Sequence, residues 1–360
     1  MRPSVLRLSL VVAIAATAAC SDSAAPAPPL NATGLLGDLT AASVASTAPS
    51  ITSLGVVGGE ISTALSAAGG ALGLADLPAV MLSEPTALRT REALQLRVTD
   101  LANNTAADIP ASALGKTFVY DTLTNTYVAS TIGGAPTNGV RFVLYAVDTA
   151  TRVVVEPLVT VGYADITRTV TANRATARVQ VFSTVGDAVK VLDYSTTVEG
   201  SALAPQVVVR GFARSASDSL AFSMETSFSL ATSSFGVTWR ALIPSRGLTT
   251  QIKETLQGGD TPRIVFDGII KSLNGNVSMA GAVTDAGGAL KVRVNGDLFA
   301  TITLSSAEDV EPTITGPTGQ PLTAEEQAML ERIFDWFTGA FEFFFDLLSP
   351  VEGLIDLAIG

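Results

Sequence analysis

Acidic side chains are the residues of this sequence that could most readily do chemistry. Asp165, Asp193 and Glu199 lie in or beside stretches in which apolar and polar residues alternate. A suitably placed pair of carboxyl groups is sufficient to hydrolyse a glycosidic bond, one donating a proton and the other acting as nucleophile or base. Nothing in the spacing of these acids selects a pair. We therefore expect solvated surface acids, and a carboxylate-dependent glycan hydrolase is the second alternative function.

The sequence lacks the residues that most other catalytic mechanisms require. The chain has no histidine and a single cysteine, Cys20, which excludes Ser-His-Asp triads and histidine-ligated zinc. Gly115-Lys116-Thr117 matches the end of a phosphate-binding loop, but Pro110 replaces the first glycine and the lysine leads into a predicted strand. The acidic stretch Glu308–Glu311 lacks the spacing of a calcium-binding EF-hand loop. We expect no catalytic, cofactor-binding or metal-ligating residues.

The beginning of the chain predicts export and lipid attachment. Residues 1–19 combine two arginines, a short apolar stretch and small residues, which is the pattern of an export signal peptide. The stretch is too short to span a bilayer, which takes about 20 apolar residues. Thr17-Ala18-Ala19-Cys20 resembles the lipobox of bacterial lipoproteins, although that family usually has Leu where Thr17 stands. The resemblance implies a lipid on Cys20, and Ser21 implies sorting to the outer membrane.

The charge of the chain argues against nucleic acid as a partner. The 22 basic and 33 acidic residues give a net charge of −11. Removal of residues 1–19 takes away two arginines and no acid, which leaves 20 basic residues and a net charge of −13. This charge has the opposite sign to the one that nucleic-acid binding requires. The partners that we expect are the membrane, through Cys20, and an apolar ligand or another envelope protein.

Composition divides the chain into a tether, a small-residue segment and a long β domain. Residues 20–34 contain three prolines and predict a flexible tether behind the lipid anchor. Residues 35–83 are rich in Ala, Gly and Ser, and we expect a helix only over Glu60–Ala67, because two glycines follow at once. From residue 84 to 310 the pattern changes to the two-residue period of β strands.

Alternation within this β domain is clear enough to assign faces to strands. In Leu220–Leu230 the large apolar residues occupy every second position, and Leu290–Val294 repeats the pattern with Lys291 and Arg293 on the polar side. Asn-Gly pairs at 274–275 and 295–296 predict tight type I′ hairpin turns. The sequence therefore predicts a mainly β fold, a large curved antiparallel meander sheet that is half-barrel or barrel-like, with roughly ten or more strands.

The last part of the chain, residues 311–360, predicts a loop and a C-terminal aromatic amphipathic helix that packs on the sheet. Thr323 and Glu326 have the spacing of a capping box at the start of this helix. The stretch 334–348 reads FDWFTGAFEFFFDLL. Its carboxylates disfavour a membrane span, and an acidic polar face disfavours a helix lying on anionic lipid. We expect the concave face of the sheet to bury its aromatic side.

These observations predict a non-enzymatic bacterial envelope lipoprotein, a membrane-tethered β domain with a binding or scaffolding role. The first alternative is a carrier or binder of an apolar ligand such as a lipid. A curved sheet covered by an aromatic helix resembles, in outline only, the half-barrel lipoprotein carriers of the bacterial envelope. No family resemblance extends to the mature domain.

Overall fold

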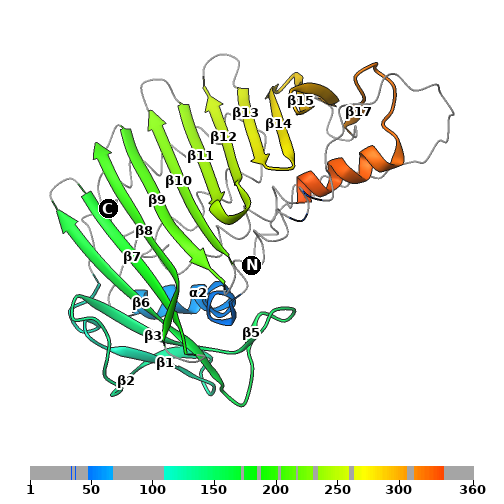
Figure 1. The fold of residues 1–360 in the computed structure, drawn as a ribbon. Coiled ribbons are helices and arrows are strands. Elements are labelled where there is room, and N and C mark those ends of the chain that lie inside the picture. The colour runs from blue at the N-terminus through cyan, green and yellow to red at the C-terminus, as the bar shows by residue number, and fades with distance from the viewer. Residues whose placement is uncertain are drawn as a thin grey trace.

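One open sheet of 15 strands dominates the structure (Figure 1). The computed structural model describes residues 34, 37, 48–67, 109–171, 174–184, 188–201, 204–215, 218–229, 234–258, 263–305 and 312–335. The strands lie in the order β17-β16-β15-β14-β13-β12-β11-β10-β9-β8-β7-β6-β3-β1-β2. Every strand from β6 onward pairs with the strand that follows it in the sequence. The predicted antiparallel meander is therefore confirmed.

The elements have the following bounds. The helices are α2 (Pro49–Ala67), the short 3-10 helix η1 (Pro244–Arg246) and a C-terminal helix described over residues 324–335. The strands are β1 (Thr117–Asp121), β2 (Thr126–Ser130), β3 (Gly139–Tyr145), β4 (Val147–Asp148), β5 (Val153–Val154), β6 (Thr160–Thr171), β7 (Arg174–Ser183), β8 (Val189–Ser201), β9 (Ala204–Arg214), β10 (Ser219–Ser229), β11 (Ser234–Ile243), β12 (Leu248–Gln257), β13 (Arg263–Ser272), β14 (Gly275–Thr284), β15 (Gly287–Val294), β16 (Asp297–Leu304) and β17 (Thr313–Thr315).

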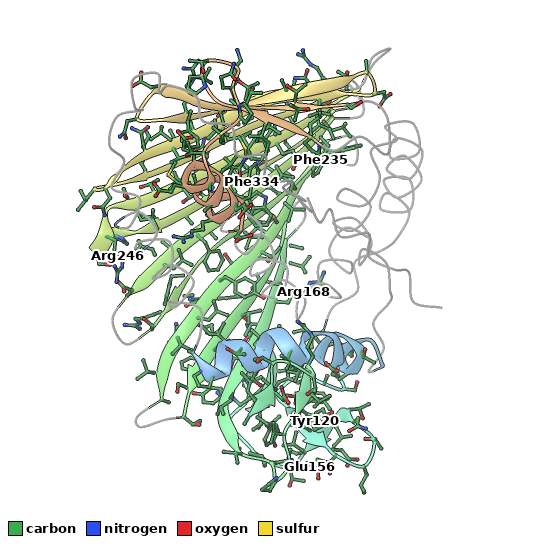
Figure 2. The ribbon with its side chains drawn as sticks, turned by 90° about the vertical axis from the view of Figure 1, so that its right-hand side faces the viewer. Tyr120, Glu156, Arg168, Phe235, Arg246 and Phe334 are labelled. Atoms are coloured by element: carbon green, nitrogen blue, oxygen red, sulfur yellow. The ribbon has the colours of Figure 1, made fainter. Side chains whose placement is uncertain are left out.

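The first strands depart from the simple meander. The hairpin β1–β2 forms one edge of the sheet, and β1 lies parallel to β3, which pairs antiparallel with β6. Strands β4 and β5 form a separate two-stranded sheet between β3 and β6 in the sequence. The direction of the strands rotates progressively along the sheet. In Figure 2 β6 runs steeply upward, whereas the strands near β16 run almost horizontally. This is the twist expected of a large antiparallel sheet.

The strands of the meander bury one face, the inner face, and expose the other, the outer face. On β10 the residues Leu220, Phe222 and Met224 are buried, and the residues between them are more exposed. On β15 Val292 and Val294 are buried, whereas Lys291 and Arg293 are exposed. Both assignments agree with the alternation read from the sequence.

One of the two predicted hairpin turns is correct in detail. Asn295 and Gly296 have φ angles of 50° and 95° between β15 and β16, as a type I′ turn requires. In the β13–β14 hairpin Ser272 pairs with Gly275, so the central residues are Leu273 and Asn274. The turn at this hairpin lies one residue earlier than we predicted.

Helix α2 packs on the inner face near the start of the sheet. It begins at Pro49, well before the predicted Glu60, and contacts strands from β2 to β8. Its buried side consists of Ile51, Leu54, Val57, Ile61 and Leu65, each at most 3% exposed. Glycine is a poor helix former, and burial of this apolar side on the sheet outweighs the cost of Gly55, Gly58 and Gly59 within the helix.

The C-terminal helix also packs on the core. Its predicted capping box is present: Thr323 N donates to Glu326 Oε2 over 2.8 Å, and Glu326 N donates to Thr323 Oγ1 over 3.3 Å. Leu330 and Ile333 are each 2% exposed within the same apolar cluster as the inner face, and Phe334 packs against it. The aromatic residues that follow Asp335 lie outside the described part of the chain, as do Cys20 and the tether.

Candidate functional site on the outer face of the sheet

The outer face of β7–β15 carries an excess of positive charge. Its strands place eleven Lys and Arg side chains there against four Asp and Glu, a net charge of +7. The basic residues are Arg174, Arg178, Lys190, Arg210, Arg214, Arg240, Lys253, Arg263, Lys271, Lys291 and Arg293, and the acidic ones are Asp193, Glu199, Glu225 and Asp267. We call this surface the basic face.

The basic face contrasts with the chain as a whole, whose net charge is −11. It holds half of the 22 basic residues of the sequence. The alternation of the strands produces this segregation, because each basic residue occupies a position whose neighbours along the strand point to the buried inner face. A surface potential depends on such local groupings rather than on the net charge alone.

Asp193 on β8 is the most heavily bonded acid of the basic face. Arg178 Nε and Nη2 donate to its two carboxylate oxygens over 2.8 and 2.7 Å, and Lys190 Nζ and Gln180 Nε2 donate to Oδ2 over 2.8 and 3.0 Å. Burial by itself would raise the pKa of Asp193, but these hydrogen bonds and the charge of Arg178 outweigh it and lower the pKa to about 2. The carboxylate is therefore ionised at neutral pH.

Asp193→Asn is expected to lower the free energy of unfolding by about 1–2 kcal/mol at pH 7. The substitution removes the carboxylate charge with which both Arg178 and Lys190 form ion pairs. The folded pKa lies below the ordinary value of about 3.9. This contribution is therefore complete above about pH 4 and is lost as the pH falls toward 2. Urea unfolding of both proteins over this pH range measures it.

Asp267→Asn is the matched control, because this exposed acid of the same face forms no hydrogen bond or ion pair with the described residues. Its effect should stay within about 0.5 kcal/mol. If the difference in unfolding free energy between Asp193→Asn and the unmodified protein does not shrink as the pH falls, the low pKa of Asp193 is contradicted.

The other two acids singled out in the sequence are also bound to arginines. Arg141 Nε and Nη2 on β3 donate to Asp165 Oδ1 and Oδ2 on β6 over 2.7 and 2.8 Å. Arg174 on β7 forms an ion pair with Glu199 on β8. Asp165 and Asp193 lie in one transverse row, but Gln180 stands between them. The structure thus brings no two of these carboxyls together, and the low pKa of Asp193 does not suit a proton donor.

Two aromatic rings on the outer face stack on each other and lie close to cations. Tyr163 and Phe182 stack with ring centroids 4.8 Å apart, Arg141 lies 3.8 Å from the Tyr163 centroid, and Lys190 lies 5.8 Å from that of Phe182. This alternation of cation, ring, ring and cation crosses four adjacent strands. It stabilises their register and places a cation beside each of these two rings.

Comparisons with protein families, curated proteins and solved structures found no match.

The inner face offers a second candidate surface. Phe228, Phe235, Leu256, Ile264 and Val283 form one transverse row from β10 to β14, and each is only partly buried. The adjacent inner row contains Glu254 between Val237 and Phe266. Burial raises the pKa of Glu254, so this carboxyl is the acid that the sequence reading missed. Its place in the alternation of β12 could have identified it.

The remaining sequence motifs have plain structural roles or lie outside the described residues. Gly115 ends a turn with a φ of 72°, and Thr117 begins β1, so the lysine between them does lead into a strand. The stretch 306–311, with the acids considered for calcium, is not described. Where the structure is described, no cluster of His, Cys, Asp and Glu could hold a metal ion, and none of the helices could span a bilayer.

Proposed function

We propose that this protein is a non-enzymatic lipoprotein of the bacterial cell envelope, tethered to the outer membrane by a lipid on Cys20, and that its β domain binds an anionic partner through the basic face. The observation that supports binding is the net charge of +7 on a face of a protein whose net charge is −11. The lipobox-like sequence ending at Cys20 supports the tether.

A fixed array of like charges is a favourable surface for an oppositely charged partner. The strands hold the basic side chains in register, so binding does not require the backbone to be ordered first. Hydrogen bonds such as Arg240 Nε to Gln251 Oε1 and Arg263 Nε to Gln257 Oε1 hold side chains in place as well. Attraction of this kind falls as the salt concentration rises.

Retention on anionic beads at neutral pH tests this proposal. The full chain, purified in a non-ionic detergent, is expected to bind at low salt despite its sequence pI of about 4.5. The double variant Lys253→Gln, Lys271→Gln removes two charges from the basic face and should elute at lower salt. Lys116→Gln, Arg332→Gln removes two exposed charges elsewhere and is the matched control. Absence of retention, or equal loss from both variants, would refute binding through this face.

A carrier of an apolar ligand is the second candidate, and the partly exposed inner row from Phe228 to Val283 favours it. Adjacent strands lie about 4.8 Å apart, so this row extends over about 19 Å of apolar surface. Native mass spectrometry of the purified protein tests the idea, because a carrier should retain co-purifying lipid. A mass equal to that of the lipidated chain, with no additional non-covalently bound lipid after gentle extraction, would leave the basic face as the binding surface.

A further inference from the structure

Arginines on the basic face stand in one line across the strands. Arg178 on β7, Arg210 on β9 and Arg240 on β11 occupy the same transverse row of the sheet, joined through Ser195 on β8 and Ser223 on β10. The row then passes through Gln251, Ile269 and Ser278 and reaches Arg293 on β15. We call these four residues the arginine row.

The register of the sheet sets the spacing of the arginine row. Neighbouring strands are about 4.8 Å apart, so arginines on every second strand recur at about 10 Å. The backbone positions of Arg178 and Arg240 are therefore about 19 Å apart, with a serine between each pair of arginines. The arginines recur at this distance perpendicular to the strands, and their spacing along the sequence does not reveal the repeat.

The guanidinium groups of the row are accessible and keep unused donors. All four side chains are exposed. Arg178 uses Nε and Nη2 for Asp193, Arg240 uses Nε for Gln251, and Arg293 uses Nη1 for the carbonyl of Gly296. Arg210 forms no hydrogen bond or ion pair with any described residue. Since a guanidinium has five N–H donors, each arginine can still bind an external anion.

The rows on either side show that the positive line between β7 and β11 is narrow. On one side lie Asp193, Phe212 and Ala221, and on the other lie Thr197, Val208 and Glu225. A flat anionic surface would press against these acidic and apolar side chains as well. A chain-like ligand that lies across the strands can follow the arginines and serines alone.

We propose that the arginine row binds a linear acidic polysaccharide whose carboxylate or phosphate groups recur about every 10 Å, as in a polymer in which every second sugar is acidic. Each arginine pairs with one anionic group, and Ser195 and Ser223 hydrogen-bond to hydroxyls of the sugars between them. This inference rests on the proposed function, because it names the partner of the same face.

Fluorescence anisotropy with end-labelled hyaluronate oligosaccharides, in which every second sugar carries a carboxylate, tests the proposal on the full chain in detergent. Affinity should rise as the fragment grows from two to three carboxylates, and neutral dextran should not bind. Arg210→Gln is expected to weaken binding about five- to tenfold and to reduce the slope of log affinity against log salt by about 1. Lys271→Gln, an exposed charge of the basic face outside the row, should weaken binding less than about twofold.

The outcomes separate this inference from the function on which it rests. Equal weakening by Arg210→Gln and Lys271→Gln would show that the basic face attracts the polymer without using the arginine row. Retention on anionic beads without any hyaluronate binding would overturn the inference and leave the proposed function standing. Failure of both assays would overturn both. Unchanged thermal unfolding of Arg210→Gln, expected for an exposed residue without partners, excludes misfolding as the cause.

Discussion

Phe142→Ala is expected to lower the free energy of unfolding by about 3–5 kcal/mol. Phe142 is completely buried, stacks on Phe118 with ring centroids 4.9 Å apart and lies nearly perpendicular to Tyr127 with centroids 5.1 Å apart. Its strand, β3, joins the β1–β2 hairpin to the meander. The cavity would therefore open where these two parts meet. A loss of this size is a large share of the 5–15 kcal/mol by which typical domains are stable.

Urea unfolding followed by tyrosine fluorescence and circular dichroism measures this loss. Leu123→Ala is the matched control, because Leu123 lies in the neighbouring β1–β2 turn and is 93% exposed. It should change stability by less than about 0.5 kcal/mol. Similar small effects of both substitutions would mean that the three-ring cluster is not part of the cooperatively folded core.

Cys20→Ser is expected to abolish membrane association of the processed protein and to leave a soluble or an uncleaved protein. A serine cannot form the thioether that would carry the proposed lipid, and no other cysteine is present in the sequence. The tether that follows has no apolar stretch long enough to replace the anchor. Cell fractionation and incorporation of a labelled fatty acid measure the result. Ser23→Ala, three residues further on, should leave both unchanged.

A Cys20→Ser protein that still partitions with membranes at its processed size would refute the lipid anchor. In that case another protein, or an apolar surface of this one, would have to hold it at the membrane. The partly exposed inner row from Phe228 to Val283 would then be the first surface to examine.

Local patterns in the sequence predict the faces of the strands and the hairpin pairing of successive strands, but not the exact turn positions or the pairing of strands that are not consecutive. The alternation of Leu220, Phe222 and Met224 is sufficient to place them in the core, because neighbours on one strand must point to opposite sides. The turn at Asn295-Gly296 follows from its residue types, whereas Leu273-Asn274 shows that an Asn-Gly pair can close a hairpin one residue away from the expected position. The parallel pairing of β1 with β3 has no local signal at all.

For the candidate sites too, the sequence indicates which residues stand on strands but not which residues they meet. That Asp165, Asp193 and Glu199 stand on strands is visible in the sequence, and the arginines that bind them lie 24, 15 and 25 residues away. The first three arginines of the row are aligned by the register of five consecutive strands from β7 to β11, which no single strand specifies. Helix α2 is long for a related reason, since its stability comes from packing on the sheet rather than from its own residues.

The connectivity of the meander makes the hairpin its natural unit of growth. From β7 to β16 each strand pairs with the strand before it and the strand after it in the sequence, and repeats in a solenoid likewise pack on their neighbours in sequence. Insertion of two strands within this series preserves which face each later residue occupies, whereas insertion of one strand would reverse the direction of all that follow. Between β7 and β11 two strands are also one period of the arginine row. Gain or loss of a hairpin of this kind would therefore lengthen or shorten the row by one arginine, and the proposed polymer site would change in length with it.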